Sequence, residues 1–203
     1  MIGIYKINPV KWAVMPFVAL LITSCVGAPK LPITSFSQVD NKETVVVGRV
    51  ELVPPLEKDE QELSFTVKKH RGKTLLITDE TYRELDDLNP GDFSGRIEAA
   101  FGKTFYVKAP NKPFYILAGV IFMRVAGTAN ERAYLPGGFK IDIKPNDKAV
   151  YIGTVRYYRD EFFKITKVEI KDNYEEENTE FRKLFGNKFK LRKELVDIVR
   201  NHK

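Results

Sequence analysis

The chain has 203 residues, of which 33 are Lys or Arg and 27 are Asp or Glu, so its formal net charge is +6. These charges are interspersed, whereas a nucleic-acid-binding protein gathers its basic residues on one face, and we exclude that class. Cys25 is the only cysteine, which rules out an intramolecular disulfide and any CxxC metal or redox site.

The first 24 residues predict a signal peptide that is removed from the mature protein. Lys6 and Lys11 provide a basic lead, and residues 12–22 form an apolar run without a charged side chain. At 1.5 Å per residue this run spans roughly 17 Å, about half of a bilayer's hydrocarbon core, so it is too short for a permanent transmembrane helix. A basic lead followed by a short apolar run is typical of a secretory leader.

The residues Ile22, Thr23, Ser24 and Cys25 close this segment and resemble the lipobox of bacterial lipoprotein precursors. The resemblance implies cleavage between Ser24 and Cys25 and attachment of lipid, palmitate included, to Cys25 as the new N-terminus. No cofactor is expected apart from this covalent lipid. The alternative is that Cys25 is a small apolar residue that happens to end the leader. Val26 is not the aspartate that resembles an inner-membrane retention signal, so the outer membrane is favoured.

Residues 25–42 are interpreted as a lipidated tether. They show neither helical nor alternating periodicity and contain two prolines. As a coil they would reach roughly 20 to 25 Å, enough to lift a folded domain clear of lipid head groups. An alternative stays open, in which Ile33 and Phe36 dock on the domain.

Residues 43–171 predict an antiparallel β-sandwich in a mainly β protein, because about seven to nine short strands follow one another with turn signals between them. The expected strands cover residues 44–53, 63–67, 74–78, 105–107, 114–123, 139–143, 149–158 and 162–171. The first three are expected to form a meander. The uncharged run 114–123 suits a strand buried on both faces at the centre of the core, with Gly119 at a bulge.

Two stretches, residues 106–116 and 141–152, share the order strand, Pro-Asn turn, strand and are interpreted as two hairpins. Residues 139–155 also resemble a strand pair of uncharacterised bacterial lipoproteins and, more distantly, of transthyretin-like and carboxypeptidase-regulatory-like sandwiches. This resemblance covers a short part of the chain. It implies a binding or structural module and no catalytic residue.

Residues 172–203 predict a C-terminal segment of one or two helices. Asp172 or Asn173 caps a first helix, whose first turn holds three glutamates that oppose the positive end of the helix dipole. Gly186 ends this helix. Its apolar face consists of Phe181, Leu184 and Phe185.

A second helix is expected from about Phe189, with basic residues around an apolar stripe formed by Leu191, Leu195, Ile198 and Val199. This stripe could pack on the sandwich. The alternative is that the basic amphipathic segment, residues 189–203, contacts anionic head groups or a partner.

Signatures of catalysis and metal binding are not found in the sequence. His70 and His202 lie far apart and without metal-ligand spacing, so no metal site is expected. The acidic residues Asp86, Asp87 and Asp92 lack the spacing of a calcium loop. There is no nucleophile elbow, phosphate-binding loop or dinucleotide fingerprint, and no catalytic residue is assigned.

An aromatic turn is the candidate ligand-binding site. Tyr157, Tyr158 and Phe162 flank Arg159, and together they could present rings and a cation to a sugar or a protein partner. Successive strand residues point to opposite faces, so about half of these side chains would face the core instead.

These observations predict a lipid-anchored lipoprotein of the bacterial cell envelope, in which a β-sandwich serves interaction or envelope assembly without catalysis. The expected partners are the membrane, through the lipid, and an envelope protein or glycan. The alternative is a periplasmic hydrolase or glycan-binding protein acting on cell-envelope polymers, which would need a cleft with convergent carboxylates or a Ser/His pair.

Overall fold

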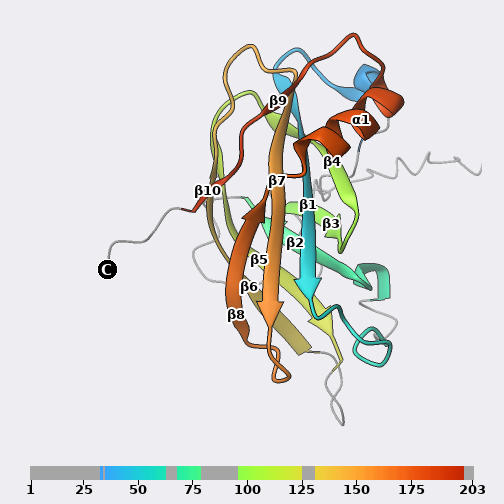
Figure 1. Ribbon diagram of the computed structural model, residues 1–203, viewed down its shortest axis with the longest axis vertical. Coiled ribbons are helices and arrows are strands. Elements are labelled where there is room, and N and C mark those ends of the chain that lie inside the picture. The colour runs from blue at the N-terminus through green and yellow to red at the C-terminus, as the bar shows by residue number, and fades with distance from the viewer. Residues whose placement is uncertain (1–32, 34, 63–67, 79–95, 125–130, 199–203) are drawn as a thin grey trace, which may run out of the picture.

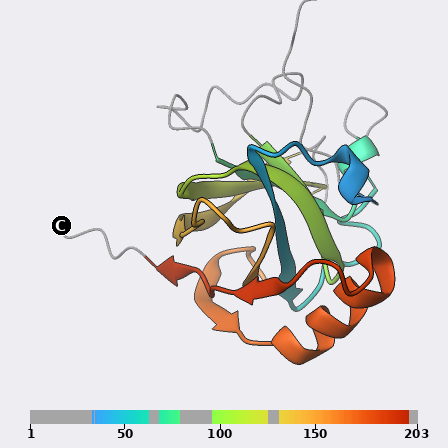
Figure 2. The same ribbon diagram turned by 90° about the horizontal axis from the view of Figure 1, so that it is seen from above.

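Two five-stranded sheets pack face to face, and one helix covers the outer side of the first sheet (Figures 1 and 2). The computed structural model describes residues 33, 35–62, 68–78, 96–124 and 131–198. The prediction of a mainly β sandwich with a C-terminal helix is confirmed. Strands rich in β-branched and aromatic residues, which suit a buried pleated surface, account for this architecture.

The first sheet has the strand order β4-β1-β7-β8, and β9 pairs with β7 beyond the end of β8. Strand β7 runs parallel to β1 and to β9, and the other pairs are antiparallel. The elements of this half are η1 (Phe36–Gln38), β1 (Glu43–Val53), β4 (Thr104–Pro110), β7 (Ala149–Arg159), β8 (Ile165–Lys171), α1 (Tyr174–Phe185) and β9 (Leu191–Lys193).

The second sheet has the order β10-β6-β5-β2-β3, with every pair antiparallel. Its elements are η2 (Lys68–His70), β2 (Lys73–Ile77), β3 (Arg96–Ala100), β5 (Phe114–Met123), β6 (Glu131–Ile141) and β10 (Asp197–Ile198). Because β9 joins the first sheet and β10 the second, the C-terminal segment connects the two.

The main core lies between the inner faces of the sheets. The first sheet contributes Val46, Val50, Val150 and Ile152, and the second contributes Leu76, Ile121, Leu135 and Phe139. Strand β1 is buried on its other face as well, where Val45 and Val47 pack with Tyr151 and with Phe181 of α1. The helix therefore forms a third layer over the first sheet.

Strand β5 is buried on both faces towards its C-terminal end, as its uncharged sequence predicted. Ile116 and Ile121 face the main core. Ala118, Val120 and Phe122 form a separate cluster with two residues of β2 on the opposite face. Side chains that point to opposite faces of this one strand therefore contribute to two separate apolar clusters.

The bulge expected at Gly119 is wrong, because the register between β5 and β6 shifts elsewhere. Between Ile116 and Ala118, β6 places Gly137 and Gly138 opposite a single β5 residue. A Cβ on Gly137 would lie 2.1 Å from the carbonyl oxygen of Leu117. The close approach of the two backbones therefore requires glycine in β6.

The meander and the two hairpins are also wrong. Strands β1 and β2 belong to different sheets, and β1 already has β4 and β7 as its two neighbours. Each Pro-Asn stretch crosses between the sheets, from β4 to β5 and from β6 to β7. The two turns nevertheless meet, because the Nδ2 of Asn111 donates to the carbonyl oxygen of Pro145.

The described part of the segment before β1 docks on the domain. Ile33 is 5% exposed, and its amide donates to the carbonyl oxygen of Tyr106 at 2.6 Å. The ring of Phe36 stacks on Phe189 with 3.9 Å between centroids and meets Phe181 edge-on. The alternative in which Ile33 and Phe36 dock therefore holds, and a free tether cannot extend past residue 32.

Helix α1 matches the expected first C-terminal helix, with Gly186 at its end. Asn173 occupies the N-cap position without a side-chain cap, and Asp172 Oδ1 accepts from the Tyr174 amide at 3.0 Å. Phe181 is buried, but Leu184, expected on the same face, is 56% exposed. The apolar face of the helix is therefore narrower than its sequence suggests.

The prediction of a second helix is wrong, because residues 191–193 and 197–198 form strands β9 and β10 instead. Strand β8 pairs with β7 only from Thr154 onward, so the start of β7 has an open edge. Strand β9 fills it, and the amides of Glu194 and Val196 donate to the carbonyl oxygens of Tyr151 and Ile152 at 2.9 and 3.0 Å. A helix would leave this edge without partners.

Several expectations lie outside the described residues. They are the signal peptide, the cleavage and lipidation residues Ser24 and Cys25, the strand at 63–67, the acidic group around Asp86, and His202.

Candidate functional site

A cleft of about 750 Å³ opens at the end of the sandwich where β1 and β7 finish, the lower end in Figure 1. Four segments form its walls: the loop after β1, the end of β5, the beginning of β6 and the turn between β7 and β8. The two sheets therefore both contribute to it. Arginine, carboxylate and aromatic side chains line it together.

Arg159, the last residue of β7, holds one wall in place. Its guanidinium binds both carboxylate oxygens of Glu60 at 2.6 and 2.7 Å and donates to the carbonyl oxygens of Pro54 and Pro55 at 3.0 and 2.9 Å. The ring of Phe163 lies 4.7 Å from the guanidinium carbon. With 8% of the residue exposed, Arg159 ties the loop after β1 to the end of β7.

The turn after Arg159 projects an aromatic ring into solvent. Asp160 Oδ1 accepts hydrogen bonds from the amides of Phe162 and Lys164 at 3.0 and 2.8 Å, which fixes the turn by an Asx-type contact. Phe163 adopts a φ of 63° within it. Phe162 is consequently 84% exposed at the rim of the cleft.

The structure does not bring the four predicted ligand-binding residues together. Tyr157 is buried in the core, where its hydroxyl donates to the carbonyl oxygen of Pro136 at 2.9 Å. Tyr158 points to the outer face of the sheet and donates to Glu169 at 2.7 Å. Tyr157 and Tyr158 thus point to opposite faces of the sheet, as the alternation of strand side chains requires. Of the four residues, Arg159 and Phe162 line the cleft.

The opposite wall comes from the second sheet and was missed by the sequence reasoning. Arg124 follows β5, while Arg132 and Tyr134 belong to β6. Arg124 makes an exposed ion pair with Glu62, at 3.4 Å, and Tyr134 is 37% exposed. Nothing in the sequence near Arg159 points to these residues, because they reach the cleft only through the packing of one sheet on the other.

The cleft combines groups that suit a polar, ring-containing ligand. Phe162 and Tyr134 offer faces on which an apolar sugar face or a planar group could stack. Arg132 is an exposed cation, and Glu57, Asp59 and Glu161 are exposed acidic residues that line the same cleft. Such a mixture of rings and charges can hold a ligand by hydrogen bonds and stacking.

His70 lies away from this cleft, buried against β3 and β5. Its ring stacks on Phe122 with 4.9 Å between centroids, and its Nδ1 lies 3.6 Å from Glu98 Oε2. His70 and Lys73 hold the pKa of Glu98 below its usual range. In the part of the chain that the structure describes, no group of three or more His, Cys, Asp and Glu side chains is placed to bind a metal ion.

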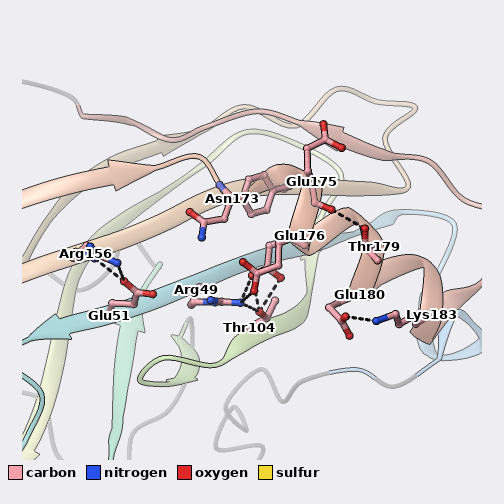
Figure 3. Close-up of polar contacts among 12 residues, drawn as sticks. Arg49, Glu51, Thr104, Arg156, Asn173, Glu175, Glu176, Thr179, Glu180 and Lys183 are labelled. Atoms are coloured by element: carbon pink, nitrogen blue, oxygen red, sulfur yellow. Dashed lines mark hydrogen bonds and ion pairs between the residues drawn. The ribbon is translucent and has the colours of Figure 1, made fainter.

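A buried polar cluster fixes α1 to the first sheet (Figure 3). Glu177 of the helix is fully buried, with Oε1 2.5 Å from Nη2 of Arg49 and both carboxylate oxygens within 2.9 Å of the Thr104 hydroxyl. Burial, aided by the charge of Glu177, raises the pKa of Tyr106 to about 12. This cluster lies under the helix and serves its attachment.

The fold and the cleft together define a β-sandwich with a mixed polar and aromatic site at one end. Comparison of the chain with protein-family models, with curated proteins and with solved structures gave no match. Among the described residues, no helix combines the length and the apolar character needed to cross a membrane.

Proposed function

We propose that the chain is the precursor of a bacterial lipoprotein, anchored through Cys25 to the cell envelope, with the outer membrane favoured over the inner. The observation that carries this proposal is the order of parts at the N-terminus. A basic lead, an uncharged apolar run and Ile22-Thr23-Ser24-Cys25 follow one another without a gap. Lipidation also accounts for the sole cysteine, which would otherwise be a reactive free thiol in an exported chain.

The lipid supplies the attachment energy in this proposal. Each methylene buried in the bilayer contributes about 0.8 kcal/mol, and more than one acyl chain is needed for durable anchoring. The folded domain then needs no membrane-spanning element of its own. Docking of Ile33 agrees with a short connection between the lipid and the sandwich.

The sandwich acts as a non-enzymatic interaction module, and the cleft is its candidate ligand site. Two of its carboxylates have structural roles: Glu60 binds Arg159, and Asp160 accepts hydrogen bonds from the amides of the turn. The exposed ring of Phe162 and the partly exposed ring of Tyr134 favour a glycan or an envelope protein as the ligand.

Metabolic labelling tests the anchor. Cells that express the chain are grown with an alkyne analogue of palmitate, and the incorporated label is measured after purification. We expect label on the natural chain and none on Cys25→Ala. The matched control Ser24→Ala keeps a small residue before the cysteine and should retain the label. Equal labelling of the natural chain and Cys25→Ala would contradict the proposal.

The alternative function, hydrolysis of an envelope polymer, is favoured by one observation. Glu57, Asp59 and Glu161 line the same cleft, and paired carboxylates are the usual machinery of glycoside hydrolysis. Release of soluble fragments from isolated envelope polymers distinguishes the two functions. Fragment release that is lost in Glu57→Gln, Asp59→Asn or Glu161→Gln would establish the enzyme, and binding without release would support the interaction module.

A further inference from the structure

Exposed lysines gather at the end of the sandwich opposite the cleft, on the connections that lie at the top of Figure 1. The connections lie before β1, between β4 and β5, between β6 and β7, and between α1 and β9. Their exposed lysines are Lys42, Lys112, Lys144, Lys148, Lys188 and Lys190, which we call the lysine end. Figure 2 looks onto this end of the molecule.

Hydrogen bonds fix these connections to one another. The amide of Asn111 donates to the carbonyl oxygen of Lys42, and the amide of Val45 donates to that of Lys148, each at 3.0 Å. The hydroxyl of Thr44 donates to the carbonyl oxygen of Asp147 at 2.8 Å. These bonds join three of the four connections, those that carry Lys42, Lys112, Lys144 and Lys148. The fourth, with Lys188 and Lys190, is held beside them where Phe189 stacks on Phe36.

The acidic groups of the lysine end are mostly paired internally. Asp147 binds the guanidinium of Arg192 through both carboxylate oxygens, at 2.8 and 2.7 Å, and Glu43 lies 3.5 Å from Lys108. In the four connections as described, residues 39–43, 110–114, 142–148 and 186–190, Asp40 is the one exposed acid. The surface that faces outward is therefore strongly positive, although the charges of the whole sequence are mixed.

The segment that leads to Cys25 joins the domain beside this lysine end. Phe36 stacks on Phe189, whose neighbours are Lys188 and Lys190. Eight peptide steps separate Cys25 from the docked Ile33, which limits the extended distance between them to roughly 27 Å. Ile33 contacts Tyr106, four residues before the end of β4 at Pro110, so this reach includes the lysine end and allows a lipid on Cys25 to place that end at the bilayer.

We propose that the lysine end lies on anionic lipid head groups of the bilayer that holds the anchor, so that the cleft faces away from the membrane. This inference rests on the proposed lipidation of Cys25. A lysine near an anionic surface strengthens membrane association by roughly fivefold, and salt screens the effect over a Debye length of about 8 Å. Strand β7 alone spans roughly 36 Å, so the cleft is presented well beyond the head groups.

The test uses the lipidated chain in vesicles. Acylated Cys25 cannot react with a thiol probe, so Asn146→Cys carries a fluorophore at the lysine end and Glu161→Cys carries one at the cleft. Quenching by a quencher placed at the head groups is compared between phosphatidylcholine vesicles and vesicles with about one third phosphatidylglycerol. We expect at least threefold stronger quenching of the Asn146→Cys probe in the anionic vesicles, reversed by high salt, and little quenching of the Glu161→Cys probe.

Charge reversal supplies the matched comparison. The variant Lys144→Glu/Lys148→Glu/Lys188→Glu/Lys190→Glu should abolish the response to anionic lipid. The control Lys58→Glu/Lys68→Glu/Lys103→Glu/Lys164→Glu changes the same number of exposed lysines elsewhere and should keep it. A response that is insensitive to the first variant, or quenching mainly at the Glu161→Cys probe, would overturn the inference.

Two further outcomes are distinguishable. The acyl mass on Cys25 is measured before reconstitution, so a chain without lipid would contradict the proposed function itself. A lipidated chain whose Asn146→Cys probe ignores anionic lipid but responds to soluble polyglutamate would assign the lysine end to an acidic protein partner. That result would overturn the inference and leave the anchor standing.

Discussion

Glu177 of α1 and Arg49 of β1 form an ion pair beneath the helix, with 2.5 Å between Oε1 and Nη2. The Glu177 side chain is fully buried, whereas Arg49 keeps 17% of its side chain exposed. A carboxylate without access to water is stable only when cations and hydrogen-bond donors surround it. The helix is therefore joined to the sheet by charge as well as by Phe181.

Removing one member of this pair should destabilise the fold strongly. Arg49→Ala leaves the buried Glu177 without its cation, and we expect the free energy of unfolding to fall by about 3 kcal/mol. Glu175→Ala, an exposed position in the same helical turn, should cost less than about 1 kcal/mol. Urea denaturation monitored by circular dichroism measures the free energy of unfolding of both variants. Similar losses in the two variants would contradict the buried role of the pair.

Asp147 should make the stability of the protein sensitive to acid. Burial alone would raise its pKa, but hydrogen bonds from Arg192 and from the Lys144 amide outweigh burial and hold the pKa below the usual 3.8. The native state therefore favours the carboxylate, and this stabilisation is complete above the pKa of the unfolded chain. It is lost as the pH falls through 3.8 and below.

Urea midpoints of the natural chain and of Asp147→Asn between pH 6 and pH 2.5 check this expectation. The substitution should lower the midpoint at pH 6 and flatten its decline in acid. Asp40→Asn changes an exposed acid of the same end of the sandwich and serves as the control. Parallel curves for the natural chain and Asp147→Asn would show that the pair with Arg192 does not contribute.

Gly137 should tolerate no side chain. A Cβ there would lie 2.1 Å from the carbonyl oxygen of Leu117, so Gly137→Ala must displace backbone and should cost about 3 kcal/mol. Gly102 has a φ of 70° but open space around its Cβ position, so Gly102→Ala should cost only about 1 kcal/mol. Thermal unfolding of both variants separates steric clash from backbone strain, and equal losses would argue against the bulge geometry.

Phe162 should matter for binding and not for stability. With 84% of the residue exposed, Phe162→Ala should change the free energy of unfolding by less than about 0.5 kcal/mol. Because the variant lacks the ring on which a ligand would stack, its retention on immobilised envelope glycan or on an immobilised partner protein should be about tenfold weaker. Leu184→Ala removes another exposed apolar side chain, on α1, and should leave retention unchanged. An equal drop in retention for both variants would contradict the hypothesis that the cleft binds the ligand.

Local sequence patterns predicted the elements that local physics determines. The β-branched run of β1, the uncharged run of β5 and the capped, glycine-ended pattern of α1 were recognised within a few residues. These elements are specified by propensity and burial along one segment. Their positions in the sequence are therefore informative without any partner.

Contacts between segments that lie far apart in the chain could not be predicted from the sequence. Residues 191–198 have a helical apolar spacing but are extended along the open edge of β7 as far as Val196, because this edge offers backbone partners that a helix could not satisfy. Likewise Glu177 reads as a residue that opposes the helix dipole, although it lies under the helix against Arg49. The cleft joins Arg159 to Arg132 and Tyr134 of the other sheet, which no local pattern brings together.

The proposed anchor requires that Cys25 carry lipid and begin the mature chain. Mass spectrometry of the N-terminal peptide from protein isolated with native membranes detects both properties at once. We predict a peptide that starts at Cys25 and carries the added mass of acyl groups. A peptide that extends upstream of Cys25, or that starts there with an unmodified thiol, would contradict the anchor and the orientation inferred from it.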